Sequence, residues 1–307
     1  MKHCLSLQDF SADEVTHLVR LALKIKKNPQ QYNQLLRGRW LLMLFQKSST
    51  RTRLSFEMGI KQLGGNSVVM DWDASNFAIS PIRYEARYVS QHAHLIMARL
   101  KTHTDLLKLA EYSRVPVING CDDTFHPCQA LADLTTVFET AGTFQHQTLC
   151  YVGIHNNVAN SLALGCARAG VHLILVTPEA NKPAHKTEML DKLEADGHLS
   201  RTLDVKQAIA KAGFVYTDTW VDMEFFKDPA YQDEKERRLK TMLPYQLNRE
   251  NMGDSDAYIL HDMPIHPGYE ITEDLVESPR SLIYRQAENR LYAQQALALH
   301  LLDTPLP

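Results

Sequence analysis

Short apolar runs alternate with longer amphipathic segments along the whole chain, and this alternation constrains the fold more than any other feature. In the first half, four runs have the length and apolar character of buried strands, at residues 40–45, 67–71, 94–100 and 115–119. Between the first two runs, Phe56, Ile60 and Leu63 recur at i, i+4 and i+7, a spacing that predicts one face of a helix. Strands separated by helices are typical of α/β layers.

A second series of the same kind begins near residue 148. Its strands are expected at 149–153, 171–177, 213–220 and 257–261. A helix is expected at 158–169, and Gly170 ends it. A length of 307 residues suits two domains of ordinary size. We therefore predict two open, mainly parallel-sheet, three-layer α/β domains, at 1–135 and 136–307. Interdomain helices such as 130–140 would join them.

Composition excludes several classes of protein. Lys and Arg number 33 against 36 Asp and Glu, so the chain lacks the basic excess of a nucleic-acid binder. No apolar stretch approaches the roughly 20 residues that span a bilayer, and no signal peptide is recognisable at the start. Five cysteines without a C-x-x-C pair indicate reduced thiols and a cytosolic protein. We predict no partner among nucleic acids or membranes.

The strongest local signal is the segment 46–53, Gln-Lys-Ser-Ser-Thr-Arg-Thr-Arg, between a predicted strand and a predicted helix. A helix start presents unpaired N–H groups and a partial positive charge, which suit a phosphate. Arginine adds permanently charged, bidentate recognition of phosphate oxygens. The segment has no glycine, so it is not a P-loop, and a small phosphorylated ligand is predicted. The alternative is a helix cap followed by exposed arginines.

Two further segments carry weaker signals. His126 stands at the mouth of a predicted helix, where it can donate a hydrogen bond to a carbonyl oxygen. Cys128 beside it allows a Cys/His nucleophile, but we favour a small buried packing residue. The stretch 233–240, rich in Lys and Arg, is predicted to be a solvated helix face.

Five motifs together carry a resemblance to a known family. Residues 45–57 are similar to the carbamoyl-phosphate signature of the aspartate/ornithine carbamoyltransferases, and residues 126–133 to the second signature of that family. The segments 156–161, 217–221 and 287–290 follow in the order of the ornithine branch. The resemblance covers nearly the whole chain. A dinucleotide-binding oxidoreductase is a poorer interpretation, because the glycine fingerprint is missing after the strand at 149–153.

The resemblance implies that domain 1–135 holds carbamoyl phosphate, that domain 136–307 holds the amine acceptor, and that a last helix at 287–302 returns to the first domain. The residues implied for carbamoyl phosphate are Ser49, Thr50, Arg51, Thr52, Arg99, His126, Gln129 and Arg290. Those implied for the acceptor are Asn157, Asp218, Asp222 and Met223. The catalytic residues would be Arg99, His126 and Asp262. The family implies a cytoplasmic homotrimer, and we expect no cofactor and no metal.

The acceptor half departs from the ornithine pattern. Where ornithine enzymes read Asp-x-x-x-Ser-Met-Gly, this chain has Asp222 and Glu224 in place of the Ser and the Gly. Where they read His-Cys-Leu-Pro, it has Asp262 in place of the Cys. Three extra acids would repel a carboxylate and suit a cationic or diamine-like acceptor. Three interpretations stay open: ornithine itself, a different amine, or a paralogue without turnover.

Overall fold

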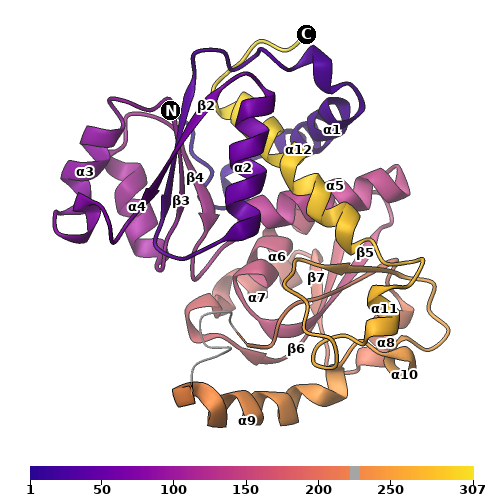
Figure 1. Cartoon of the computed structure of the whole chain (residues 1–307). Coiled ribbons are helices and arrows are strands. Elements are labelled where there is room, and N and C mark those ends of the chain that lie inside the picture. The colour runs from indigo at the N-terminus through magenta and orange to yellow at the C-terminus, as the bar shows by residue number, and fades with distance from the viewer. Residues whose placement is uncertain (222–228) are drawn as a thin grey trace.

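The structure is a computed structural model that describes residues 1–221 and 229–307, and it contains two parallel sheets (Figure 1). The first sheet has the order β2-β1-β3-β4. Its strands are β1 Trp40–Phe45, β2 Asn66–Asp71, β3 Leu95–Arg99 and β4 Val117–Cys121. The sheet leaves β2 as one edge strand.

Helices cover both faces of the first sheet. They are α1 Ala12–Lys27, α2 Thr50–Gln62, α3 Ile82–Val89 and α4 His103–Tyr112. Side chains alternate along β1, so Leu42 and Leu44 pack in the same hydrophobic cluster as α3 and α4, whereas Leu41 and Met43 share a cluster with α1 and α2. Figure 1 shows α3 and α4 on one side of the sheet and α1, α2 and α12 on the other.

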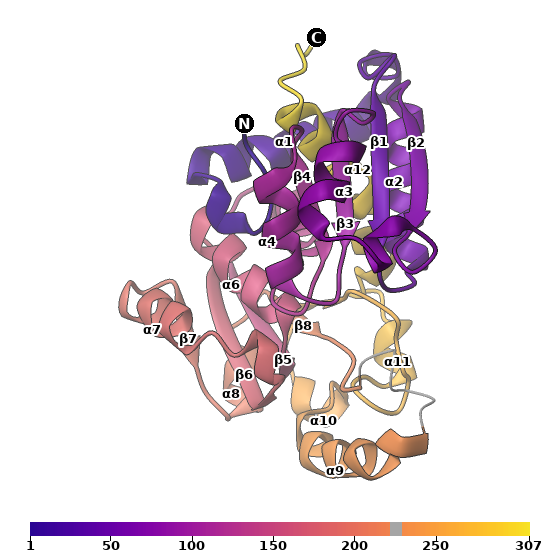
Figure 2. The same cartoon turned by 90° about the vertical axis from the view of Figure 1, so that its left-hand side faces the viewer.

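The second sheet has the order β7-β6-β5-β8-β9. Its strands are β5 Thr148–His155, β6 His172–Ala180, β7 Leu199–Arg201, β8 Phe214–Thr217 and β9 Tyr258–His261. The helices of this half are α6 Asn157–Ala169, α7 Thr187–Ala195, α8 Val205–Ala210, α9 Gln232–Met242, α10 Arg249–Met252 and α11 Glu273–Val276. Figure 2 shows α9 at the end of this half that is farthest from the first sheet.

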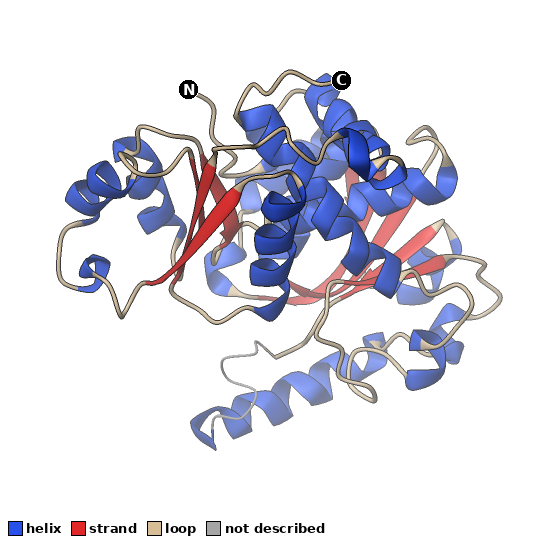
Figure 3. Cartoon of the chain, turned by 45° about the horizontal axis from the view of Figure 1, so that its top comes forward, coloured by secondary structure: helices blue, strands red, loops and turns tan. Residues whose placement is uncertain are grey.

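Two long helices join the halves. Helix α5, Pro127–Ala141, is buried over most of its length and ends at Gly142, whose φ of 74° is readily available only to glycine. The last helix, α12 Ile283–Leu301, packs against α5, α1 and α2. Figure 3 shows helices filling the space between the two sheets. Short 3-10 helices lie at Leu7–Asp9, Pro29–Gln31, Asn76–Ala78, Lys182–Ala184, Pro229–Tyr231 and Leu243–Tyr245.

The predicted fold class, two parallel-sheet α/β units joined by helices, is confirmed. The strand expected at 115–119 instead continues to Cys121, because the buried Asn119 amide donates to the Leu5 carbonyl and the strand need not end at a polar residue. The strand expected at 213–220 ends earlier, at Thr217. The last helix begins at Ile283, before the predicted 287.

Candidate active site

A cavity of about 760 Å³ opens where strands of both sheets end. Parallel sheets place ligands at the carboxyl ends of their strands, and here two such edges face one cavity. The residues that directly follow β5, β8 and β9, namely Asn156, Asp218 and Asp262, line it on one side. Arg99, the last residue of β3, lines it on the other side. The cavity therefore has a cationic end and an acidic end.

The start of α2 forms the wall of the cationic end. Ser49 caps this helix, because its side chain accepts a hydrogen bond from the Thr52 N–H at 3.3 Å. Ser49, Arg51 and Thr52 line the cavity. Thr50 is exposed and lies outside the lining residues, and Arg53 is exposed and pairs with Glu57 at 3.4 Å. Of the two arginines in the predicted phosphate segment, only Arg51 faces the cavity.

Three guanidinium groups gather at the cationic end. Arg290 Nη2 donates to Thr52 Oγ1 at 3.2 Å, and Arg99 Nη1 lies 3.5 Å from the same oxygen. The Nε atoms of Arg99 and Arg290 are buried and have no hydrogen-bond partner among the described residues. Burial, followed by the charge of neighbouring arginines, lowers the pKa of Arg51 and of Arg290. Such a cluster is suited to an anion that neutralises it and accepts from several N–H groups.

His126 lies beside this cluster, immediately before α5. Its side chain is 6% exposed, and its Nδ1 has no partner within the described residues. Burial lowers the pKa of His126 well below its usual value, and the charges of Arg290, Arg99 and Arg51 lower it further. The imidazole is therefore neutral at physiological pH, and it can donate one hydrogen bond into the cavity without carrying a charge.

Gln129 is fully buried and is not among the residues that line the cavity. Its side-chain oxygen accepts a hydrogen bond from Arg290, and its amide nitrogen donates to Asp133 at 2.8 Å. Gln129 thus holds Arg290, which faces the cavity. Its predicted contact with the carbamoyl group stays a prediction.

Asp218 and Asp262 form the acidic end. Asp218 accepts from Asn156 Nδ2 at 2.5 Å and from the Thr219 N–H at 2.6 Å. Burial raises the pKa of Asp262 well above its usual value, and the charge and hydrogen bond of Asp218 raise it further. Asp262 Oδ1 is buried and has no hydrogen-bond partner among the described residues. The two carboxyl groups therefore differ in their surroundings, because Asp218 receives two N–H donors whereas Asp262 Oδ1 receives none among the described residues.

The turn that carries Asp262 is fixed from behind by His261. The His261 imidazole is buried, with Nδ1 accepting from the Met263 N–H at 2.8 Å and Nε2 lying 3.1 Å from Glu270 Oε1. Met263 has a φ of 62°, a conformation that non-glycine residues rarely adopt. These contacts hold the Asp262 carboxyl at the cavity wall.

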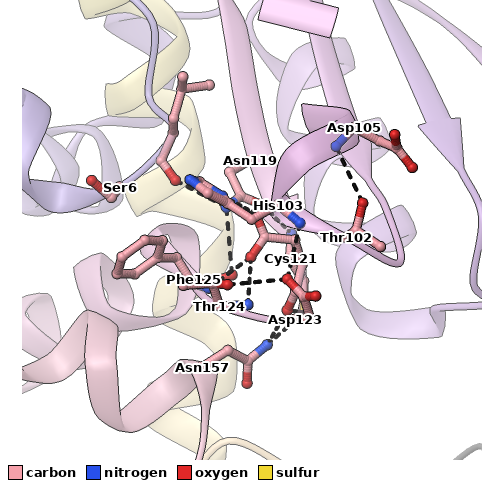
Figure 4. Close-up of polar contacts among 12 residues, drawn as sticks. Ser6, Thr102, His103, Asp105, Asn119, Cys121, Asp123, Thr124, Phe125 and Asn157 are labelled. Carbon is pink, nitrogen blue, oxygen red and sulfur yellow. Dashed lines mark hydrogen bonds and ion pairs between the residues drawn. The ribbon is translucent and has the colours of Figure 1, made fainter. Parts of the chain in front are cut away.

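Asn157, predicted to meet the acceptor carboxylate, already uses its side-chain N–H donors. Its Nδ2 donates to the Asp122 carbonyl at 2.5 Å and contacts Cys121 Sγ at 3.2 Å, and Figure 4 shows it pointing toward the turn after β4. That turn is itself braced, because the Asp122 carboxylate lies 2.6 Å from His103 Nδ1. Asn157 lines the cavity, and its contact with an acceptor stays a prediction.

Some predicted residues are not described, and some lining residues were not predicted. Asp222, Met223 and Glu224 lie outside the described residues. Asn156 had no predicted role, although an Asn-Asn pair after a predicted strand is a signal for a helix cap, and Asn156 caps α6. Arg238, from the stretch predicted to be a solvated helix face, lines the cavity with a largely buried side chain. Other lining residues without an assigned role include Lys101, Asp123, Lys182 and Tyr231. No local pattern distinguishes their charged side chains from ordinary surface residues.

The alternative chemistries considered from the sequence find little support. Cys128 is buried, burial raises its pKa to about 12, and its Sγ contacts the Asn119 carbonyl at 3.3 Å, so it is a packing residue and not a nucleophile. All five cysteines are free and buried. Within residues 1–221 and 229–307, no three His, Cys, Asp or Glu side chains are grouped to hold a metal ion. No helix of that part is long and apolar enough to cross a membrane.

The comparison with known proteins agrees with the geometry of this cavity. Residues 2–139 match the family model "Aspartate/ornithine carbamoyltransferase, carbamoyl-P binding domain", and residues 145–301 match "Aspartate/ornithine carbamoyltransferase, Asp/Orn binding domain". An ornithine carbamoyltransferase of Archaeoglobus fulgidus is 39% identical, over 98% of both chains.

Solved structures give the same result. The ornithine carbamoyltransferase of Pyrococcus furiosus superposes with a TM-score of 0.88 at 35% identity, over 97% of this chain and 96% of that one. The enzyme of Thermus thermophilus gives 0.86 at 32% identity, over 98% of this chain and 99% of that one. The chain therefore belongs to the aspartate/ornithine carbamoyltransferase family.

Proposed function

We propose that the protein moves the carbamoyl group of carbamoyl phosphate to an amine, with ornithine, which becomes citrulline, as the first acceptor to test. The observation that carries the proposal is the arrangement of Arg51, Arg99 and Arg290 around a helix start, with neutral His126 beside them. This arrangement suits a phosphate joined to a polarisable carbonyl group. The relatives named ornithine carbamoyltransferase support the choice of ornithine.

The cationic end would hold the phosphate. We assign this role to the Ser49 and Thr52 hydroxyls, the N–H group of Thr50, and the guanidinium groups of Arg51 and Arg290. Arg99 would contact both the phosphate and the carbonyl oxygen. Domain 1–135 would then bind carbamoyl phosphate, and domain 136–307 would bind the acceptor.

His126, Arg99 and Thr52 would stabilise the oxyanion that develops on the carbamoyl group. A positioned donor of this kind is worth about 3–4 kcal/mol of transition-state stabilisation. A neutral imidazole suits the task because it donates without adding a further charge to the arginine cluster. Gln129 would act through Arg290, which it accepts from.

The acidic end would receive the amine. Above the raised pKa of Asp262, where this carboxyl group is ionised, an acceptor ammonium gives one proton to it, and the nitrogen lone pair then forms a bond to the carbamoyl carbon. The bond from that carbon to the phosphate oxygen breaks, and phosphate leaves with the electron pair. The second proton of the nitrogen goes to the departing phosphate. Asp218 and Asn157 would hold the rest of the acceptor, together with the undescribed Asp222 and Met223.

A second candidate function differs only in the acceptor. The pairing of Asp262 with Asp218 places two acidic groups where the family has an acid and a thiol, and this favours a diamine or another cationic amine without a nearby carboxylate. A paralogue that binds carbamoyl phosphate without turnover is the third interpretation, and the intact cationic end argues against it.

An assay for ureido products with a panel of amines tests the proposal. The panel includes ornithine, its α-blocked derivatives and 1,4-diaminobutane, each with carbamoyl phosphate. Turnover of ornithine supports the first candidate, and turnover of a diamine alone supports the second. If no amine is carbamoylated while phosphate still binds, the protein is not a carbamoyltransferase for these acceptors.

The family resemblance also supports a homotrimer in the cytoplasm. The exposed apolar side chains of Leu54 and Met58 on α2, and of Val68 on the edge strand β2, offer an apolar surface on the first half for contact between copies. Five free cysteines suit a reducing compartment. A Pyrococcus furiosus relative named as the anabolic enzyme supports a role in arginine biosynthesis.

A further inference from the structure

Asp133 is a completely buried carboxyl group that lies behind the cavity and does not line it. It stands on α5, one turn after Gln129, and faces Gln286 of α12. Its Oδ1 accepts from Gln129 Nε2 at 2.8 Å and from Gln286 Nε2 at 2.7 Å. Its Oδ2 has no hydrogen bond within the ordinary distance among the described residues, although the buried Tyr216 hydroxyl lies near enough to lower the pKa of Asp133. One oxygen atom therefore binds the amide groups of two glutamines that are 157 positions apart in the chain.

This contact fixes which way each glutamine amide points. Oδ1 offers lone pairs to both amides, so each glutamine turns its NH₂ group toward Asp133 and its oxygen away from it. The oxygen of Gln129 then accepts from Arg290, and the oxygen of Gln286 accepts from the His261 N–H at 2.8 Å. A flipped amide would set donor against donor at Arg290 or at His261. In this orientation, both the nitrogen and the oxygen of each glutamine amide have a hydrogen-bond partner.

The two branches lead to opposite ends of the cavity. On one side, Arg290 donates both to Gln129 and to Thr52, which lies at the start of α2. On the other side, the His261 backbone held by Gln286 directly precedes Asp262, which lines the acidic end. Asp133 lines neither end of the cavity, but both ends are connected by hydrogen bonds to the same atom, Asp133 Oδ1.

We infer that Asp133 is a positioning residue for both substrates, which orients Arg290 through Gln129 and the Asp262 turn through Gln286. The inference rests on the proposed function, because it assigns the two ends of the cavity to the two substrates. It predicts that one buried substitution alters both binding steps, although each step uses different contacts.

Stability does not explain a carboxyl group at this position. Burial raises the pKa of Asp133 to about 7, even though the Gln286 and Gln129 donors and the charge of Arg290 lower it. A well-packed apolar side chain would avoid this cost of burial. A residue that lowers stability and orients two site residues has a positioning role as its simplest explanation.

The experiment compares Asp133→Leu, Asp133→Asn, Gln286→Leu and Thr135→Val. Thr135 is the matched control, because it is fully buried on the same helix and, within the described part of the chain, its hydroxyl donates to the Leu131 carbonyl of its own helix. Phosphate affinity is measured by calorimetry. The KM values and kcat are measured with the best amine of the panel.

We expect Asp133→Leu to weaken phosphate binding and to raise the acceptor KM, each by about 10-fold or more, since small misplacements of site groups have effects up to about 100-fold. Gln286→Leu should raise the acceptor KM similarly and leave phosphate affinity within 2-fold. Asp133→Asn keeps an accepting oxygen and should restore phosphate affinity to within about 3-fold. Thr135→Val should change neither quantity by more than 2-fold.

Three results would overturn the inference. The first is an Asp133→Leu protein with both constants unchanged. The second is a Gln286→Leu protein that loses phosphate affinity as strongly as Asp133→Leu. The third is an Asp133→Asn protein whose phosphate affinity falls by about 10-fold or more. This result can be measured even if the Asp133→Leu variant does not fold. Wild-type turnover tests the proposed function separately, and the phosphate branch needs no turnover to be measured.

Discussion

Arg290 Nη2 donates to Thr52 Oγ1 at 3.2 Å, although 238 positions separate the two residues in the chain. Thr52 is in the first turn of α2, and Arg290 is on the last helix, which packs against α1, α2 and α5. The cationic end of the cavity therefore depends on the docking of α12. A truncation that removed α12 would take away one of the three guanidinium groups as well as a large part of the core.

Arg51→Ala should lose affinity for phosphate and carbamoyl phosphate. Removal of one partner from a buried charged pair costs about 2–5 kcal/mol, which corresponds to a loss of at least about 30-fold. Calorimetry measures it directly. Arg53→Ala is the matched control, because Arg53 belongs to the same segment but is exposed and paired with Glu57. Equal phosphate affinities in the two variants would show that Arg51 does not bind the phosphate.

His126→Ala should lower kcat by about 100-fold or more and leave phosphate affinity nearly intact, because a donor to the developing oxyanion acts mainly in the transition state. The strongly lowered pKa of His126 adds a second expectation. The imidazole should stay neutral through the physiological range, so it should not contribute an inflection near pH 6.5 to the rate profile. An inflection near pH 6.5 in the wild type that is absent from His126→Ala would contradict this account. Normal turnover by His126→Ala would mean that His126 has a structural role only.

Asp133 should make the folded protein less stable as the pH rises. Its pKa in the folded state, about 7, lies above the ordinary value of 3.8. Between these two values the folded state holds a proton that the unfolded state has lost, so the free energy of unfolding falls as the pH rises toward 7. The loss amounts to about 4 kcal/mol in total.

Asp133→Asn cannot titrate and should escape this loss. We expect urea unfolding to show that the free energy of unfolding of the variant, relative to that of the wild type, is higher at pH 8 than at pH 5. A difference that is constant between the two values would mean that Asp133 does not titrate in this range.

The sequence predicted local patterns well and tertiary contacts poorly. Strand β1 was predicted at its observed bounds, because an isolated apolar run between polar segments is a local signal. Arg290 and His126 were carried over from motifs, and they do line the cavity. The contact between Gln129 and Arg290 could not be predicted, because nothing in the local sequence shows that an arginine 161 positions away donates to the Gln129 side-chain oxygen.

The extra acids show the same limit. The departure from the His-Cys-Leu-Pro motif of the family identified Asp262 as an unusual residue, but only the fold shows that it lies close to Asp218. That contact requires β8 and β9 to be neighbours, with the residues that follow both strands turned toward one cavity. The register of two strands separated by some 40 residues cannot be read from either strand alone.

The last prediction concerns the choice of acceptor. At a pH above the raised pKa of Asp262, a carboxylate about 4 Å from the ionised Asp262 side chain, at an effective dielectric constant near 20, would be disfavoured by about 4 kcal/mol before screening. Ornithine can bind only with its carboxylate directed away from Asp262, whereas 1,4-diaminobutane has no carboxylate to place. Asp262→Cys restores the residue that the family usually has. We expect the ratio of kcat/KM for ornithine to that for the diamine to rise by at least 10-fold in this variant.

The pH dependence supplies an independent measurement. Among the described residues, the charged and titratable groups around Asp262 include Asp218, Asp133, Arg51, Arg290, the buried Tyr216 and His261, whose Nδ1 lies 3.7 Å from Asp262 Oδ1. As the pH rises through the raised pKa of Asp262, this carboxyl group gains a negative charge and should bind a cationic amine more tightly. The acceptor KM of the wild type should therefore fall over that range, and the fall should disappear in Asp262→Cys. If the substrate ratio and the pH profile are both unchanged in the variant, the Asp218–Asp262 pair does not select the acceptor.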